Sequence, residues 1–102
     1  MNIIKPITKT VGVKNDDGKT RYDLVLPEFE EGVAKVLTFG ADKYEANNWM
    51  NVEDPKNRYY AAVRRHLAAW RKGELIDEES GLPHLAHVAT NIMFLQHFDE
   101  EK

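Results

Sequence analysis

The 102-residue chain contains no cysteine, which excludes disulfide bonds, thiolate metal sites and a cysteine nucleophile. Long apolar runs are also missing: the first residues, MNIIKPITK, are interrupted by Lys5 and Pro6, and no later run approaches the roughly 20 apolar residues that span a bilayer. Positive charge is not in excess, because 14 lysines and arginines stand against 17 acidic residues. We therefore expect a soluble cytoplasmic protein that binds neither a membrane nor polymeric nucleic acid.

The rest of the composition, 42% hydrophobic and 30% charged, is typical of a globular domain, and the length suits one domain spanning residues 1–102. Three segments carry apolar residues at helical spacing. The first begins at Pro27 and closes at Lys43, the second follows the candidate N-cap Asp54 and ends near residues 72–73, and the third covers residues 83–98.

The first 26 residues lack helical periodicity and cluster turn-forming residues around Gly18. We expect them to form an irregular arm, with short extended pieces at residues 3–4 and 11–13, and the last residues, 99–102, to fray. The predicted fold class is all-α, a small domain of about three to four helices without βαβ alternation.

The last predicted helix is apolar around most of its circumference, so we expect it to be buried against neighbours on several sides. Three of its polar residues, His84, His87 and Asn91, fall on one face at spacings of i, i+3 and i+7. We call these three residues the polar stripe. Buried polar groups need partners, so the stripe is either a satisfied part of the core or a site.

Carboxylates precede this helix, and His66 lies on the second predicted helix. Histidines grouped with carboxylates bind divalent metals, and such a site suits manganese, cobalt, nickel or zinc at least as well as magnesium. The predicted metal ligands are Asp77, Glu79, His84 and His87, and the sequence leaves the identity of the metal open.

Five basic residues suit the phosphates of a nucleoside polyphosphate, because arginine and lysine make charge-assisted contacts with phosphate oxygens. They are Lys19, Arg21, Lys43, Arg58 and Arg65. The alternative is that most of these side chains lie on solvated helix faces.

Three blocks, GKTRYDLVLPE, VAKVLTFGADKYEANNW and RYYAAVRRHLAAWRKGELIDEESGLPHLAHVATNIMFL, resemble in order the phage and prophage family described as the N-terminal domain of dATP/dGTP diphosphohydrolases (MazZ-like). The resemblance covers residues 18–96. It implies a helical fold distantly similar to the MazG-like nucleotide pyrophosphohydrolases, which hydrolyse a nucleoside triphosphate to monophosphate and pyrophosphate with a divalent metal. Those enzymes build their site from more than one subunit, so we expect a homo-oligomer, a dimer or higher, acting in the host cytoplasm if a phage encodes it.

The sequence departs from the carboxylate blocks of the MazG-like enzymes, Glu-Glu-x-x-Glu and Glu-x-x-Asp. Glu30 and Glu31 are followed by Ala34 in place of the third glutamate, and the Glu-x-x-Asp match at residues 74–77 follows a glycine outside the helix. Either the metal site is rebuilt, or the protein binds nucleotides without hydrolysing them.

For an enzyme, the resemblance implies metal-assisted attack of water on the triphosphate, with Mg²⁺ or Mn²⁺ as the expected cofactor. Glu79 would orient or deprotonate the water, and His84 and His66 are the other catalytic candidates. Trp49, in a polar loop, is the aromatic residue that we expect to face the base. The predicted substrate-binding residues are Lys19, Arg21, Lys43, Asn48, Trp49, Arg58, Arg65 and Asn91. Two other classes stay open: a nucleotide-binding sponge protein without catalysis, and a structural oligomeric module.

Overall fold

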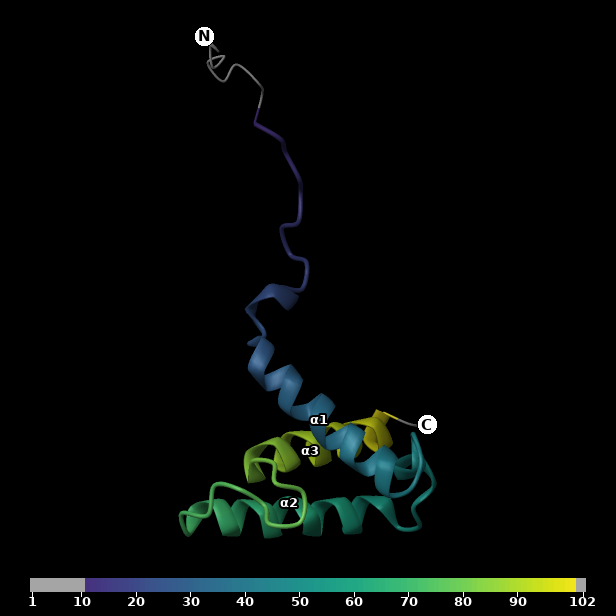
Figure 1. Cartoon of the computed structure of the whole chain (residues 1–102). Helices are drawn as coiled ribbons and strands as arrows, with labels where there is room; N and C mark the ends of the chain where they lie inside the picture. The colour runs from purple at the N-terminus through teal and green to yellow at the C-terminus, as the bar shows by residue number, and fades with distance from the viewer. Residues whose placement is uncertain (1–10, 101–102) are drawn as a thin grey trace.

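The computed structural model describes residues 11–100, and every regular element among them is helical (Figure 1). An isolated antiparallel bridge between Ile76 and Pro83 is the exception to this helical pattern. The all-α class and the three predicted helices are confirmed. In chain order the elements are η1 (Tyr22–Leu24), α1 (Pro27–Lys43), η2 (Asn48–Asn51), α2 (Pro55–Arg71) and α3 (His84–Glu100).

The helix boundaries follow from proline and glycine. Pro27 and Pro55 occupy the first turns of α1 and α2, where the missing N–H of proline leaves no bond unmade. Gly73 follows α2 with φ of 99°, a conformation that favours glycine. Asp54 does stand at the N-cap of α2, but its carboxylate makes no capping bond and instead accepts hydrogen bonds from the side chain of Asn57. The helix α3 runs beyond its predicted end at residue 98, to residue 100.

The third helix packs against both α1 and α2 (Figure 1). The crossing with α1 is close, because a Cβ at Gly32 would lie 3.3 Å from the Cβ of Ala86 on α3. Glycine lowers the stability of α1 as an isolated helix, but the absence of a side chain at Gly32 allows α3 to pack closely against α1.

The buried apolar side chains of the described residues are few: Val36, Val63 and Phe94, one from each α-helix. The ring of Trp49 in η2 stacks on Phe94, with centroids 4.3 Å apart. The hydroxyl of Tyr59 donates a hydrogen bond to the carbonyl of Trp49 at 2.8 Å. These contacts fix η2 against α2 and α3.

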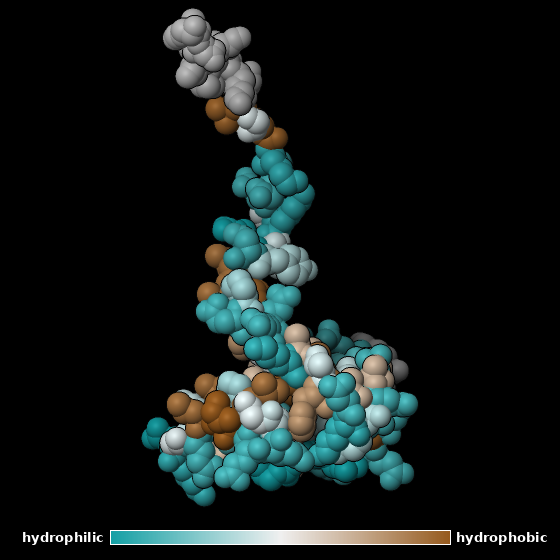
Figure 2. All heavy atoms as spheres, in the orientation of Figure 1, coloured by the Kyte–Doolittle hydropathy of each residue, from teal (hydrophilic) through white to brown (hydrophobic). Residues whose placement is uncertain are grey.

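The expectation that α3 is buried on several sides is wrong for the single chain. Leu85, Ile92 and Met93 are 45%, 48% and 37% exposed, whereas the members of the polar stripe are only 7–8% exposed. The reason is that α1 and α2 cover one part of the circumference of α3, and that part carries the polar stripe. Figure 2 shows hydrophobic surface on the body of the molecule, below α1.

The segment from residue 11 to residue 21 has no helix or strand and extends away from the three helices (Figure 1). Residues 11–21 match the predicted irregular arm in lacking helix and strand, residues 11–13 form no extended strand, and the 3-10 helix η1 (Tyr22–Leu24) is regular structure that the prediction for residues 1–26 did not include. The extended piece predicted at residues 3–4 lies outside the described residues, as do residues 101–102 of the predicted frayed end. No helix in the described range is long and apolar enough to cross a membrane.

Candidate functional site

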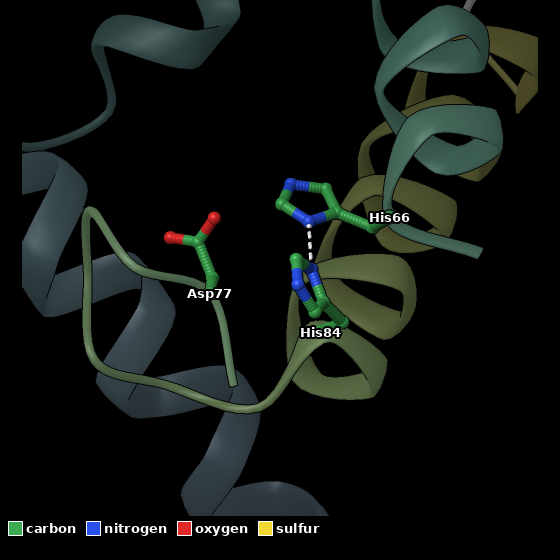
Figure 3. Close-up of side chains that lie close together, drawn as sticks. All are labelled: His66, Asp77 and His84. Carbon is green, nitrogen blue, oxygen red and sulfur yellow. Dashed lines mark hydrogen bonds between the residues drawn. The ribbon is translucent and has the colours of Figure 1, made fainter. Parts of the chain in front are cut away.

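Three side chains from separate segments converge at the first residue of the polar stripe, His84 (Figure 3). His66 comes from α2, Asp77 from the loop between α2 and α3, and His84 from the first turn of α3. The two histidine Nδ1 atoms are 2.8 Å apart, and one ligand atom from each of the three residues lies within 4.8 Å of the others. We call this group the histidine–aspartate cluster; it is the one group of potential metal ligands of this kind within residues 11–100.

A serine holds the aspartate of the cluster in place. Oδ2 of Asp77 accepts hydrogen bonds from the N–H and the hydroxyl of Ser80, at 2.9 and 2.8 Å. The same hydroxyl lies 2.7 Å from Nε2 of His87. Since a carboxylate only accepts, the single hydroxyl proton is directed to Asp77, and His87 therefore donates from Nε2.

The loop itself is closed by its backbone. The N–H of Asp77 bonds to the carbonyl of Leu82 at 2.8 Å, and the N–H of His84 bonds to the carbonyl of Leu75 at 2.9 Å. Gly81, with φ of 73°, makes the reversal between these bonds. The loop thereby brings the aspartate next to the start of α3.

Burial lowers the pKa of both His66 and His87, and the proximity of other histidines lowers the pKa of each further, against the attraction of Asp77. Burial of the Asp77 carboxyl works to raise its pKa, but the two hydrogen bonds from Ser80 and the nearby imidazoles outweigh it, so this pKa lies below its usual range. Near neutral pH the carboxylate of Asp77 is therefore ionised and the imidazole of His66 is unprotonated, the forms that bind metal.

A cleft of about 1140 Å³ lies between the helices and includes most of the predicted site. A volume of this size exceeds the range of about 300–1,000 Å³ that is usual for small-molecule sites. The predicted site residues that line it are Lys43, Asn48, Trp49, Arg58, Arg65, His66, Asp77, Glu79, His87 and Asn91. His84 adjoins the cleft through its contact with His66.

An ion pair connects the end of α1 to the loop. Nζ of Lys43 lies 2.7 Å from Oε2 of Glu79, and this hydrogen bond, with a smaller contribution from Tyr44, raises the pKa of the lysine. Glu79 thus lines the cleft next to a cation, whereas the ligand atoms of the histidine–aspartate cluster do not include it.

Two predicted phosphate-binding residues lie elsewhere. Lys19 and Arg21 are on the arm, outside the lining of the cleft. The guanidinium of Arg21 makes two bonds to the carboxylate of Asp23, at 2.8 and 2.7 Å. Within this single chain the structure does not bring them to the other site residues.

The acidic start of α1 is also separate from the cluster. Glu30 and Glu31 are exposed, and Glu31 pairs with Lys35 at 3.4 Å. Of the residues that match the MazG-like blocks, Asp77 alone belongs to the histidine–aspartate cluster. The single chain therefore brings one of these block residues to the cluster and leaves Glu30 and Glu31 outside it.

Sequence reasoning missed Ser80 and underestimated the packing of Trp49. The spacing Asp77-x-x-Ser80 followed by glycine is a turn signature that would have linked the two side chains. Trp49 lines the cleft, but its ring also stacks on Phe94 and makes a T-shaped contact with Phe98, so it packs against α3 as well.

Comparison with known proteins adds an independent finding to this geometry. A family described as "dATP/dGTP diphosphohydrolase, N-terminal" matches residues 9–102. The chain belongs to this family. A relative named dATP/dGTP diphosphohydrolase, from Salmonella phage PMBT28, is 40% identical over 84 residues, which make up 82% of this chain and 28% of the relative. The chain therefore spans little more than a quarter of that relative's length, and no solved structure matches it with significance.

Proposed function

We propose that the chain hydrolyses a deoxynucleoside triphosphate, dATP or dGTP, to the monophosphate and pyrophosphate in a reaction that requires a divalent metal ion. The observation that carries this proposal is that one cleft is lined by three cations and by His66 and Asp77, two of the three residues of the histidine–aspartate cluster. Membership of the dATP/dGTP diphosphohydrolase N-terminal family and the name of the phage relative support the choice of substrate.

The cations of the cleft bind the triphosphate. Lys43 stands at the end of α1, and Arg58 and Arg65 lie on α2, all three along the same cleft. Their charge-assisted bonds to phosphate oxygens offset the charge of the triphosphate in a chain whose net charge is -3. The base contacts Tyr44, which lines the cleft and is 63% exposed, and Trp49, which also lines the cleft.

The reaction breaks one phosphorus–oxygen bond and forms another. A water oxygen attacks the α-phosphorus, the bond from that phosphorus to the oxygen bridging to the β-phosphate breaks, and pyrophosphate leaves. Glu79 accepts the proton of the water. The arginines neutralise charge that develops on the leaving pyrophosphate. The histidine–aspartate cluster would hold a divalent ion, which would supply positive charge for the phosphate oxygens.

The ion pair of Lys43 with Glu79 couples binding to this chemistry. With no substrate, the ammonium group lies against the carboxylate at 2.7 Å. A phosphate that enters the cleft competes for the ammonium, and the carboxylate is then released to accept the proton of water. The pair keeps the base neutralised until substrate arrives.

The first experiment incubates the protein with dATP, dGTP and the other nucleoside triphosphates in the presence of Mg²⁺ or Mn²⁺, with the products separated by ion-exchange chromatography. We expect monophosphate and pyrophosphate, and at least about a 100-fold loss of turnover in Glu79→Gln, as for removal of a general base. The matched control is Glu78→Gln, which removes the neighbouring exposed carboxylate and should retain activity. Intact nucleotide together with a nucleotide-dependent rise in Tm would instead identify a binding protein.

The protein partner in this proposal is a second copy of the chain. Among residues 11–100 the core contains three buried apolar side chains, which is little for a domain of this size, and the outer side of α3 exposes Leu85 and Ile92. Burial of these two side chains against a symmetric copy adds the apolar area that the single chain lacks. Sedimentation tests this: we expect a dimer or higher oligomer that Ile92→Glu dissociates, and a wild-type monomer at every concentration would contradict it.

A further inference from the structure

We infer that His66, Asp77 and His84 form a binding site for a first-row transition ion of the kind of Co²⁺ or Zn²⁺ in preference to Mg²⁺ (Figure 3). This deepens the proposed function, because it names the residues and the class of ion in the same cleft. It stands on the geometry of three side chains, and its test requires no nucleotide.

The separation of the two imidazole nitrogens fits an ion. Nδ1 of His66 lies 2.8 Å from Nδ1 of His84. At a metal–nitrogen bond length of about 2.0–2.1 Å, two nitrogens in neighbouring coordination positions are about 2.9–3.4 Å apart. The observed Nδ1–Nδ1 distance is thus within a few tenths of an ångström of that separation. In the metal-free form one nitrogen must carry the proton that joins them, and an ion takes the place of that proton.

The third ligand is already oriented. Both hydrogen bonds from Ser80 go to Oδ2 of Asp77, and Oδ1 receives neither of them. Oδ1 is the oxygen left for an ion, and one oxygen of Asp77 lies within 4.8 Å of a ligand nitrogen of each histidine. Ser80 holds the carboxylate through Oδ2, and His87 bonds to Ser80 behind it, as an outer shell. Three protein ligands leave coordination positions open for water and for a phosphate oxygen, as in catalytic metal sites.

The donor set selects against magnesium. Two of the three donors are imidazole nitrogens, which bind cobalt, nickel and zinc well, whereas Mg²⁺ prefers oxygen ligands in octahedral geometry. The carboxylate of Glu79, which could supply a further oxygen, is bonded to Lys43 instead. The burial of His84, which is 7% exposed, keeps competing water from one side of the site.

The experiment titrates EDTA-treated protein with Co²⁺ and follows the visible absorption of the bound ion and the heat of binding. We expect one ion per chain, and at least about 100-fold weaker binding in His66→Gln and in Asp77→Asn, since each loses a ligand. Glu79→Gln and the matched control Glu78→Gln should bind Co²⁺ like the wild type. Mg²⁺ in large excess should not displace the cobalt spectrum.

Three results would overturn the inference: no Co²⁺ binding by the wild type, unaltered Co²⁺ binding in both ligand variants, or displacement of bound Co²⁺ by Mg²⁺ in large excess. Far-UV circular dichroism verifies that each variant is folded, and Asp77→Asn changes a loop residue without loss of volume, so a folded variant is available. The two proposals fail separately. Hydrolysis with Mg²⁺ in a protein that does not bind Co²⁺ overturns only this inference, and specific Co²⁺ binding without hydrolysis overturns only the proposed function.

Discussion

Replacement of Ser80 by alanine tests how much the loop depends on one hydroxyl. That hydroxyl bonds to Asp77 at 2.8 Å, to His87 at 2.7 Å, and accepts the N–H of Leu82 at 3.1 Å. His87 is only 8% exposed, so its Nε2–H depends on this hydroxyl as an acceptor. Without the hydroxyl, Oδ2 of Asp77 is 3.6 Å from Nε2, which is too far for a hydrogen bond. A buried donor left unsatisfied costs about 1–3 kcal/mol.

The assay is urea unfolding of metal-free protein near neutral pH, at one fixed protein concentration, followed by tryptophan fluorescence. A loss of about 2 kcal/mol lowers the urea midpoint by about 1 M, for an m-value of about 2 kcal/mol/M. Thr38→Ala is the control, because Thr38 is exposed and its hydroxyl bonds back to the carbonyl of Ala34 in its own helix; it should stay within about 0.5 kcal/mol of the wild type. If Ser80→Ala also stays within that margin, the reasoning about His87 is refuted.

Three further predictions concern stability. Gly40→Ala should raise Tm by several degrees, because no neighbouring atom lies within 4 Å of the added Cβ and alanine stabilises a helix by about 0.5–1 kcal/mol relative to glycine. Gly32→Ala should raise Tm by less, because its added Cβ would lie close to α3. Equal rises in Tm for the two variants would refute the close crossing of α1 and α3. Stability in EDTA should be highest above the unfolded histidine pKa of about 6.5 and fall as pH drops below it, because the folded-state pKa values of His66 and His87 are lowered and the unfolded chain binds more protons there; a flat urea midpoint across that window would count against this. Tyr59→Phe should cost about 1 kcal/mol by loss of the hydroxyl bond to a main-chain carbonyl, and an unchanged midpoint would show that water replaces it.

The three helices could be predicted because their signals are local. Pro27 and Pro55 mark first turns, and the apolar spacing within each segment needs no knowledge of the other segments. The burial of α3 could not be predicted in the same way. Its apolar residues lie all around the helix, so the sequence does not indicate which side α1 and α2 cover, and the covered side carries the polar stripe.

The candidate site was predictable in its parts but not in its arrangement. His84 and Asp77 were expected as metal ligands because they lie close in sequence, and both belong to the histidine–aspartate cluster. The sequence predicts a catalytic role for His66 but not a role as a metal ligand. Its contact with His84 depends on the packing of α2 against α3, which the sequence does not show. In the sequence Glu79 and Asp77 are equivalent candidates for metal ligands. In the structure, Ser80 holds the carboxylate of Asp77 at the cluster, whereas the carboxylate of Glu79 pairs with Lys43.

The closed loop has a consequence for the order of folding. Asp77 and His84 are joined by a short segment whose backbone bonds form within the loop itself, so bringing these two side chains together costs little chain entropy. His66 joins them only when α2 docks on α3, which is a longer-range event. The last step in assembling the three side chains is therefore the docking of two helices, and an ion held between them would act as a reversible cross-link that slows their separation.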